Sequence, residues 1–555
     1  MELPEKKSPT ERLDVQRKIE DTLSGDRPID KLYPYISPDY KLQFTHIGTE
    51  KQLFIDNYML DHLEDVERVF PEPERPPRPI LEGGELPWED KRYCNPIVSG
   101  PVYDAEDGKF KLWYAQSMTG NLFNLDQALC YAESTDCLNW SKPLSDACLP
   151  FGDHKATNIV GFDISGAGIV LNPDQSNPDT KFLMVYCPYE RAKELGEPFM
   201  TTVAGSPDGL RWRVISEDSK RRHHHLLSII WDESIQRWVG YSQHSPCWHI
   251  GPRTRQIARQ ESEDFINWSP KEVVLSGDWD PSVSPNMEFG FMSVRKIGGQ
   301  YIGIVSEYPC EPLWTVREDG ANQRSQVHPR FGLYCSRDGL RWHRAGESPW
   351  VGNRRPGSQD YGFADGSATG QMVHKGKTYI PYCGCPHKQW MSGHKEYPDM
   401  VPESERAKSE DHCKLLKSLG HYPNWPYEAG PLRRAIGVLI LREDGWAEIR
   451  PTYEHARVVT KQFVFEGDTL KVNAECSYGC VKVEILDPHF KPYEGFSAEE
   501  CDLVHCSDSE KAWHTVTWQG NREVRELWNK PCRIVFHLHE ASLYGFQFSY
   551  ELTGK

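Results

Sequence analysis

The stretch YAESTDCLNWSKP at residues 131–143 decides how this chain folds, because variants of it recur along the sequence. Related stretches follow at AGSPDGLRWRVIS (204–216), ARQESEDFINWSP (258–270) and LYCSRDGLRWHRA (333–345). These four copies share the pattern Ser-x-Asp-x-x-x-Trp, with the aspartates at Asp136, Asp208, Asp264 and Asp338. A degenerate fifth copy, LILREDGWAEIRP (439–451), keeps Asp444-Gly445-Trp446.

Each copy follows an apolar, aromatic stretch that reads as a strand, such as FKLWYAQS (110–117), and this is preceded by another strand with a polar turn. One repeat therefore predicts four strands. The turn after the aspartate supplies the positive φ of a tight hairpin, and the tryptophan fills the space between neighbouring sheets. Four strands repeated five times predict a five-bladed β-propeller. A set of unrelated hairpins with similar turns is the alternative.

The sequence on either side of the repeats has a different pattern. Residues 1–44 read as a tail with one short helix near 10–24, and LFIDNYMLDHL (53–63) reads as a strand that completes a blade. After about residue 455, alternating strands continue without the Asp-x-x-x-Trp element, which predicts a β-sandwich. We therefore expect an all-β chain with three parts: an N-terminal tail over 1–44, a five-bladed propeller over 45–455 and a small C-terminal β-sandwich over 456–555.

Composition argues against several classes of partner. The formal net charge at pH 7 is −17, whereas nucleic acids and anionic membranes require a basic face. No apolar run approaches the ~18–20 residues of a membrane span, and the polar N-terminus shows no apolar core of a secretory signal. The 16 cysteines contain no pair of CxxC motifs, which a structural zinc ribbon requires. We expect a cytoplasmic protein with reduced thiols, of unspecified oligomeric state.

In a propeller the first strand of each blade lines the central channel, so polar residues at the starts of these strands converge on the axis. The predicted inner strands begin at RYCNPIVSG (92–100), IVGFDISGAGIV (159–170), RRHHHLLSII (221–230), PNMEFGFMSV (285–294) and SQDYGFADGSATG (358–370). A buried carboxylate without a partner is costly, so a convergent set of acids predicts a site. Hydrogen bonding to backbone amides, or a structural cation in the channel, is the alternative.

Several stretches carry a resemblance. They are LFIDNYML, LPWED, GKFKLWY, YAESTDCLNW and AIGVLILREDGW in the predicted propeller, and VKVEILD and SLYGFQF in the predicted sandwich. Over roughly residues 50–550 the chain resembles the five-bladed propeller proteins described as glycosidase-like, which are related to glycoside hydrolases of the invertase/levansucrase and arabinanase/xylosidase type. The resemblance implies a carbohydrate-active enzyme that cleaves a terminal glycosidic bond of an oligo- or polysaccharide in the central funnel.

Those hydrolases use three inner-strand acids: a base or nucleophile on blade one, a pKa-tuning acid on blade two and a general acid Glu on blade three. Glycoside cleavage needs one carboxylate that attacks or activates water and one that protonates the leaving oxygen. Asp163 matches the blade-two acid, but blade one offers Asn95 and blade three offers histidines. The family triad is therefore not intact. We predict a catalytic set of Asp163, Glu288, Asp365 and His224.

The histidines in KRRHHHLLSIIWDES (220–234) have three competing roles. His223 and His225 are candidate ligands of a divalent metal in the central channel. A histidine is also a candidate acid or base in place of the blade-three Glu, and a polar strand entrance is the third reading. Beyond this metal no cofactor is implied. The predicted substrate contacts are Arg92, Tyr93, Asn95, Asn158, His244, Arg330, Asp360 and His387.

Two further functions stay open. In a polysaccharide or uronate lyase, His224 or His225 would abstract a proton next to a uronate carboxylate. In a non-catalytic glycan-binding propeller, the missing blade-one acid has no consequence. A hydrolase releases reducing sugar without new ultraviolet absorbance, a lyase creates an absorbing unsaturated uronate, and a binding protein does neither.

Overall fold

The computed structural model describes residues 45–89, 94–95, 100–117, 127–196, 200–218, 226–244, 255–277, 287–309, 329–355, 358–365, 370–386, 434–505 and 511–551. These residues are almost entirely strands and connections, with one short α-helix, α3 (Tyr189–Glu194), and the 3-10 turns η1 (Pro178–Thr180) and η5 (Arg525–Leu527). The all-β prediction is confirmed. The helix predicted near 10–24 lies outside the described residues.

The structure bears on two features that relate to the chain's surroundings: membrane-spanning helices and the oxidation state of the cysteines. In the described residues we find no helix with the length and apolar character that crossing a bilayer requires. Eleven described cysteines are free thiols, whereas Cys476 is disulfide-bonded. The expectation of fully reduced thiols is therefore wrong at Cys476.

Five antiparallel sheets follow one another along the chain, each running from an inner to an outer strand. Sheet 1 contains β5 (Cys94–Asn95) and β6 (Val102–Asp104) on its inner side, then β7 (Lys109–Ser117), β8 (Gln127–Ser134) and β9 (Ile159–Phe162). Sheet 2 contains β10 (Ser165–Leu171), β11 (Phe182–Cys187), β12 (Thr201–Ser206) and β13 (Arg213–Asp218). Sheet 3 contains β14 (Leu226–Asp232), β15 (Arg237–His244), β16 (Gln256–Ser262) and β17 (Glu272–Leu275). Sheet 4 contains β18 (Met287–Ile297), β19 (Gln300–Pro309), β20 (Arg330–Ser336) and β21 (His343–Arg344), and sheet 5 contains β22 (Phe363–Asp365), β23 (Met372–His374), β24 (Lys377–Cys385) and β25 (Ala435–Arg442).

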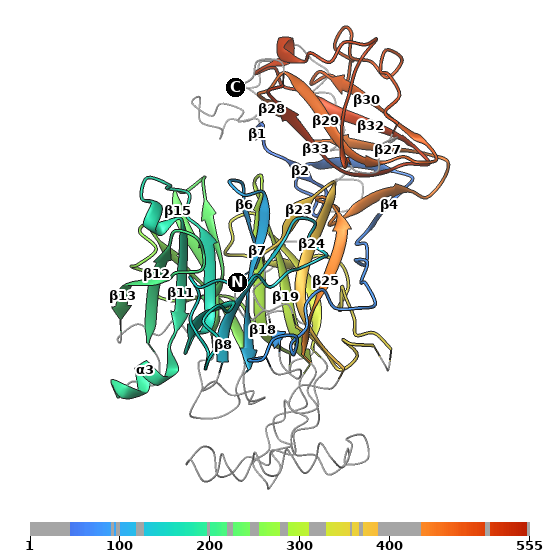
Figure 1. Cartoon of the computed structure of the whole chain (residues 1–555). Coiled ribbons are helices and arrows are strands. Elements are labelled where there is room, and N and C mark those ends of the chain that lie inside the picture. The colour runs from blue at the N-terminus through green and yellow to red at the C-terminus, as the bar shows by residue number, and fades with distance from the viewer. Residues whose placement is uncertain are drawn as a thin grey trace, which may run out of the picture.

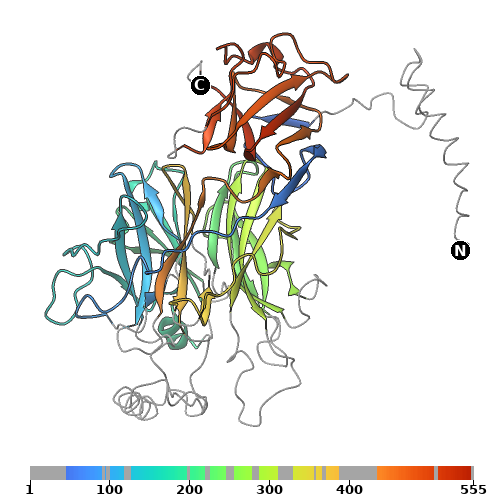
Figure 2. The same cartoon turned by 90° about the vertical axis from the view of Figure 1, so that its right-hand side faces the viewer.

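Contacts between neighbouring sheets close them into a ring, which Figures 1 and 2 show from two sides. The inner strands β10, β14 and β18 lie side by side, β20 contacts β22, β25 contacts β5, and β6 contacts β10. A buried apolar cluster lies between each pair of neighbouring sheets, including the fifth and the first. Face-to-face sheets arranged radially are the architecture of a β-propeller. The propeller prediction is confirmed.

Sheet 5 is completed by a segment from the N-terminal side of the ring. Glu74 and Ile440 exchange two backbone hydrogen bonds of 2.9 Å, and the N–H of Ile436 donates to the carbonyl of Leu81 at 2.9 Å. Residues 74–81 therefore form the outer edge of the last sheet, although they precede the first sheet in sequence. This pairing joins the two ends of the ring.

The recurring motif folds through hydrogen bonds within seven residues. In the second copy, Ser206 Oγ accepts from the N–H of Gly209 at 2.8 Å, and Asp208 Oδ1 accepts from the N–H of Arg211 at 2.9 Å. Trp212 Nε1 donates to the carbonyl of Gly209 at 3.1 Å, where φ is +80°. The residue after the aspartate also has positive φ in the other full copies, at Cys137, Phe265 and Gly339. The predicted left-handed turn is confirmed.

Each motif turn also packs against the preceding sheet. Trp113 Nε1 in sheet 1 donates to the carbonyl of Gly209 at 2.8 Å, and its ring lies edge-on to that of Trp212 at 6.1 Å. Tyr241 in sheet 3 makes the same kind of bond to the carbonyl of Gly339 at 2.9 Å and an edge contact with Trp342. The motif tryptophans thus fill the space between sheets, as predicted.

Two further sheets share one buried core at one end of the ring. One has the order β31-β29-β33-β26-β4 with β2 beside β33, the other has the order β3-β27-β32-β30, and β1 pairs with β28. Their strands are β1 (Thr45–Gly48), β2 (Gln52–Leu53), β3 (Leu60–Glu64), β4 (Val66–Val69), β26 (Glu448–Pro451), β27 (His455–Thr460), β28 (Phe463–Phe465), β29 (Thr469–Glu475), β30 (Cys480–Leu486), β31 (Trp513–Thr515), β32 (Arg533–His539) and β33 (Ser542–Ser549). We call this unit the C-terminal sheet pair.

The stretch 53–63 belongs to this sheet pair, so the prediction that it completes a blade is wrong. β2 pairs with β33 and β3 pairs with β27. The reason is the buried ring of Phe54, which belongs to the core of the C-terminal sheet pair. It lies 6.1 Å from the ring of Phe536 and 6.0 Å from that of Phe546. We propose a domain division in which residues 45–69 and 448–551 form the C-terminal sheet pair and the residues between them form the ring.

Side-chain bonds join the sheet pair to one end of the ring. Gln300, the first residue of β19, bonds to both the N–H and the carbonyl of Leu53 at 3.0 and 2.9 Å. Lys51 Nζ lies 2.6 Å from Asp444 Oδ2 in the turn after β25. Since β18 ends at this face, it begins at the opposite one, which lies away from the sheet pair in Figure 1. We call that opposite face the open end of the ring.

Candidate functional site

The predicted acids lie at the open end. Glu288 is the second residue of β18, which ends against the sheet pair. Asp365 pairs with Cys383 near the end of β24, whose other end reaches the sheet pair. Asp163 directly follows β9 and lies two residues before β10, whose first residue pairs with the last residue of β11, just before α3. Figure 1 shows α3 at the open end, so three sheets contribute an acid to this face.

All five inner strands are interrupted shortly after they begin. The pairing register shifts between Ser165 and Gly168 in β10, between Leu226 and Ser228 in β14, and between Phe289 and Met292 in β18. In sheets 1 and 5 the inner side consists of two separate strands, β5 with β6 and β22 with β23. Bulges bend a strand, re-aim its side chains and occur often beside active sites. The interruptions therefore set the open-end segments apart from the regular walls of the ring.

Glu288 has a cationic partner in a nearly buried position. Its side chain is 6% exposed, and its Oε2 lies 3.7 Å from Arg255 Nε. The Arg255 guanidinium lies 5.1 Å from the ring centroid of Tyr308, which is the cross-strand neighbour of Glu288. A Cβ at Gly290 would come within 2.2 Å of the Tyr308 ring, so the glycine leaves room for it. The bulge, the tyrosine and the arginine together hold the carboxylate in place.

Asp163 occupies a sharp turn between two sheets. Its φ is 55°, and its Oδ2 accepts a hydrogen bond from the N–H of Arg191 in α3 at 3.1 Å. Residues 159–162 before it form β9, the outer strand of sheet 1, so the prediction of one continuous inner strand over 159–170 is wrong. Burial, followed by the charges of Glu217 and Asp163, raises the pKa of Tyr186 to about 12. Asp163 is thus half-buried, hydrogen-bonded and close to a protonated tyrosine.

His244 ends β15 on sheet 3, between the sheets that carry Asp163 and Glu288. Burial and the positive charge of Lys271 lower the pKa of its imidazole, which favours the neutral form of His244. Burial also lowers the pKa of Lys271 to about 8, and its Nζ donates to the carbonyl of Gln243 at 3.0 Å. A neutral imidazole both donates and accepts hydrogen bonds, as the predicted substrate contact requires.

Arg330 is anchored to a fully buried acid beside the open end. Glu307 Oε2 accepts from Ser348 Oγ at 2.9 Å and lies 3.7 Å from Arg330 Nε. Glu307 Oε1 is held by Arg344 and by Tyr334 Oη. The Arg330 side chain is 28% exposed, and its Nη2 donates to Ser348 Oγ at 3.3 Å. This arrangement is compatible with the predicted substrate contact.

Asp360 lies inside the wall of the ring. Its carboxylate accepts from Arg354 Nε at 2.6 Å, Arg75 Nη1 at 3.1 Å and Tyr382 Oη at 2.9 Å. Burial, then the charge of Asp360, raises the pKa of Tyr382. The Asp360 side chain is fully buried and both its oxygens are bonded. The structure therefore favours an anchoring role over the predicted contact with substrate.

Asn158 is also a wall residue. Its Oδ1 accepts from Trp88 Nε1 at 3.0 Å, and its Nδ2 donates to Tyr114 Oη and to the carbonyl of Tyr131, both at 2.9 Å. The Tyr114 hydroxyl in turn donates to Glu89 Oε1 at 2.8 Å. Asn158 is fully buried, so its geometry also favours a structural role.

The described residues therefore bring Asp163, His244, Glu288 and Arg330 to the open end. The backbones of Asn95 and Asp365 lie in β5 and β22. The other predicted site residues lie outside the described residues: Arg92, Tyr93, His223, His224, His225 and His387. Two functional neighbours escaped sequence reasoning, Arg255 and Lys271. The only available signal was a charged residue flanking an apolar strand.

Comparison with protein-family models finds no match, and comparison with curated proteins finds none either. Among solved structures, the chain is similar to an N-acetylgalactosamine deacetylase from F. plautii, with 12% identity and a TM-score of 0.38 over 68% of this chain and 96% of that one. It is also similar to a GH32 β-fructofuranosidase from Bombyx mori (13% identity, TM-score 0.35, 85% and 94% covered) and to a thermostable family-43 glycoside hydrolase (14%, 0.35, 65% and 92%). We infer nothing about activity from similarities at these TM-scores. The assignment of the propeller fold is based on the strand pairing and the contacts between sheets.

Proposed function

We propose that this protein is a glycoside hydrolase that cleaves a terminal glycosidic bond of an oligo- or polysaccharide at the open end of the ring. The observation that carries the proposal is the nearly buried Glu288 carboxylate beside Arg255, at the start of an inner strand. Asp360, a carboxylate of the ring wall, lies between Arg75 and Arg354. Glu288 instead lies where a bulge sets the strand apart from the wall.

Glycoside hydrolysis needs two carboxyl groups with different tasks. In the proposal Glu288 is the carboxylate that attacks the anomeric carbon or activates water, because Arg255 supplies a positive partner for its charge. Asp365, on β22, donates the proton to the leaving oxygen, with His224 assisting. Asp163 is held by the Arg191 amide and orients the sugar hydroxyls. His244 and Arg330 bind the substrate.

Product analysis tests the proposal and separates it from its rivals. The full chain is incubated with a panel of natural oligosaccharides and aryl glycosides, and both reducing sugar and ultraviolet absorbance are followed. Release of reducing sugar without new absorbance supports the hydrolase. Appearance of an absorbing unsaturated uronate would establish a lyase, and binding without either product would establish a glycan-binding protein. Either of the last two results overturns the proposal.

A further inference from the structure

Two histidines face each other across strands of the C-terminal sheet pair, remote from the open end. His455 begins β27 and His539 ends β32, and the two residues are directly paired in the antiparallel register. Directly paired residues project from the same face of a sheet, with their Cβ atoms about 4.5–5.5 Å apart. The rings of His455 and His539 stack with centroids 4.6 Å apart and an interplanar angle of 22°.

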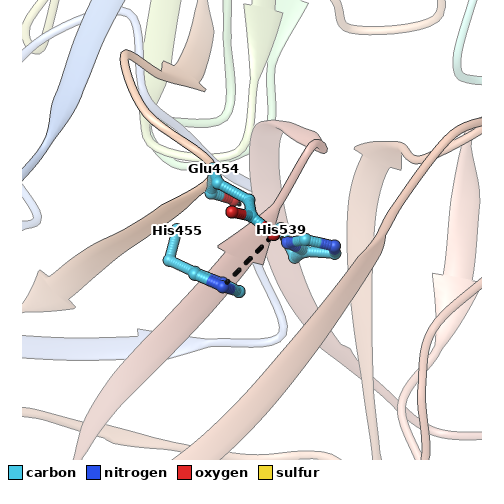
Figure 3. Close-up of side chains that lie close together, drawn as sticks. All are labelled: Glu454, His455 and His539. Carbon is cyan, nitrogen blue, oxygen red and sulfur yellow. Dashed lines mark hydrogen bonds and ion pairs between the residues drawn. The ribbon is translucent and has the colours of Figure 1, made fainter.

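A carboxylate completes this cluster. Glu454 precedes His455, and its Oε1 lies 3.8 Å from His455 Nε2. One ligand atom from each of Glu454, His455 and His539 lies within 4.8 Å of the other two, and Figure 3 shows the three side chains together. Two imidazoles and a carboxylate form a donor set that suits zinc and similar divalent transition metals.

The tautomer of His539 is set by its backbone contact. Its Nδ1 lies 3.1 Å from the carbonyl oxygen of Glu454. A carbonyl oxygen only accepts hydrogen bonds, so Nδ1 carries a proton and Nε2 is the ring nitrogen left for a metal. Metal-binding histidines characteristically donate their second ring N–H to a carbonyl or carboxylate in this way. His539 therefore has the backbone hydrogen bond that is typical of a metal-binding histidine.

The cluster borders an accessible pocket of about 530 Å³. The side chains of His455 and Glu454 are 75% and 71% exposed, so both can rotate toward an ion. Two other groups of the pocket are already paired: Arg457 lies 3.4 Å from Glu64, and His537 Nε2 lies 2.9 Å from a carboxylate oxygen of Glu484 on β30. The cluster thus lies beside a space through which an ion can reach it.

We propose that Glu454, His455 and His539 form a binding site for a divalent transition-metal ion of the zinc type. Zinc binds nitrogen and oxygen ligands at about 2.0–2.2 Å, so small rotations of the exposed side chains bring the donor atoms together. Water or an external ligand fills the remaining position. The site is independent of the proposed glycosidase, since it lies on a different sheet system.

The test is a zinc titration of the untagged, chelator-treated full chain by calorimetry, with elemental analysis after gel filtration. Because the chain has 21 histidines, any of which could take up added zinc, the readout is the difference between variants. We expect H455Q and H539Q each to lose one zinc equivalent relative to the unsubstituted protein. His537 is the matched control: it lies on the same strand, face and pocket, but is bonded to Glu484, so H537Q keeps all equivalents.

Folding is checked separately, by thermal melting without metal. His455 is exposed, whereas His537 and His539 are partly buried, so the melting temperature of each variant without metal serves as its own reference. Added zinc should then raise the melting temperature of H537Q more than that of H455Q or H539Q. Equal zinc content in all four proteins overturns the proposal, and so does loss of the equivalent in H537Q, which would assign the metal to other ligands.

Discussion

Replacing Asp360 by Asn tests whether this residue anchors the ring or contacts substrate. The substitution removes a negative charge from between Arg75 and Arg354, whose side chains are only 9% and 20% exposed. Breaking a buried ion pair on one side costs about 3–5 kcal/mol, and the retained size and amide oxygen of Asn place this variant near the lower value. At roughly 2 °C per kcal/mol for a large domain, the melting temperature should fall by about 6 °C.

The assay is thermal melting followed by circular dichroism, with Glu263→Gln as the matched control. Glu263 pairs with Arg237 at 2.7 Å on the surface, where the side chains are 74% and 44% exposed. Exposed pairs contribute about 0–1 kcal/mol, so this variant should melt with the unsubstituted protein. If Asp360→Asn also melts there, and only the KM for a glycoside rises, the anchoring role is refuted and the residue is a substrate contact.

Two further predictions concern the turns and the buried lysine. Gly209→Ala places a Cβ 2.5 Å from the Trp113 ring at φ +80°, whereas Gly152→Ala, at φ +56°, meets nothing within 4 Å. In urea denaturation, Gly152→Ala should lower the free energy of unfolding by about 1–2 kcal/mol because of its left-handed backbone alone. Gly209→Ala should lower it by about 1–3 kcal/mol more because the added Cβ overpacks the contact with Trp113. Equal losses in the two variants would contradict the packing of this turn against Trp113. Burial lowers the pKa of Lys271 from its ordinary 10.5 to about 8, so between these pH values the unfolded chain holds a proton that the folded chain has released, and stability rises with pH. Lys271→Met should therefore have a higher free energy of unfolding than the unsubstituted protein at pH 7, and this difference should shrink from pH 8 to 10. A difference that does not change with pH would show that burial does not lower the pKa of Lys271.

The ring was predictable because its repeat is local. Ser206 and Asp208 bond to backbone amides within three residues, so the motif specifies its own turn wherever it occurs. The placement of LFIDNYMLDHL was not predictable in this way. Its alternating pattern suits either sheet system, and the contact that decides between them joins Phe54 to Phe536, far away in sequence.

The site was predictable in outline and not in detail. Polar residues that interrupt apolar strands mark both functional and wall positions. Asp360 lies in the wall of the ring, where Arg75, which is 285 positions away in sequence, reaches it. The end of β9 was missed because Asp163 adopts positive φ without a glycine to signal the turn. Which polar residues have partners depends on the packing of sheets that are distant in sequence.

The most direct test of the proposed function is the initial rate of reducing-sugar release from the best glycoside of the panel, compared between the unsubstituted protein, Glu288→Gln and Glu263→Gln. Removing a catalytic carboxylate should lower kcat by about 10²–10⁴-fold, whereas the surface variant should keep the full rate with an unchanged melting temperature. A Glu288→Gln variant that remains folded and hydrolyses the glycoside at the unsubstituted rate, or a protein that releases no sugar from any member of the panel, would contradict the account.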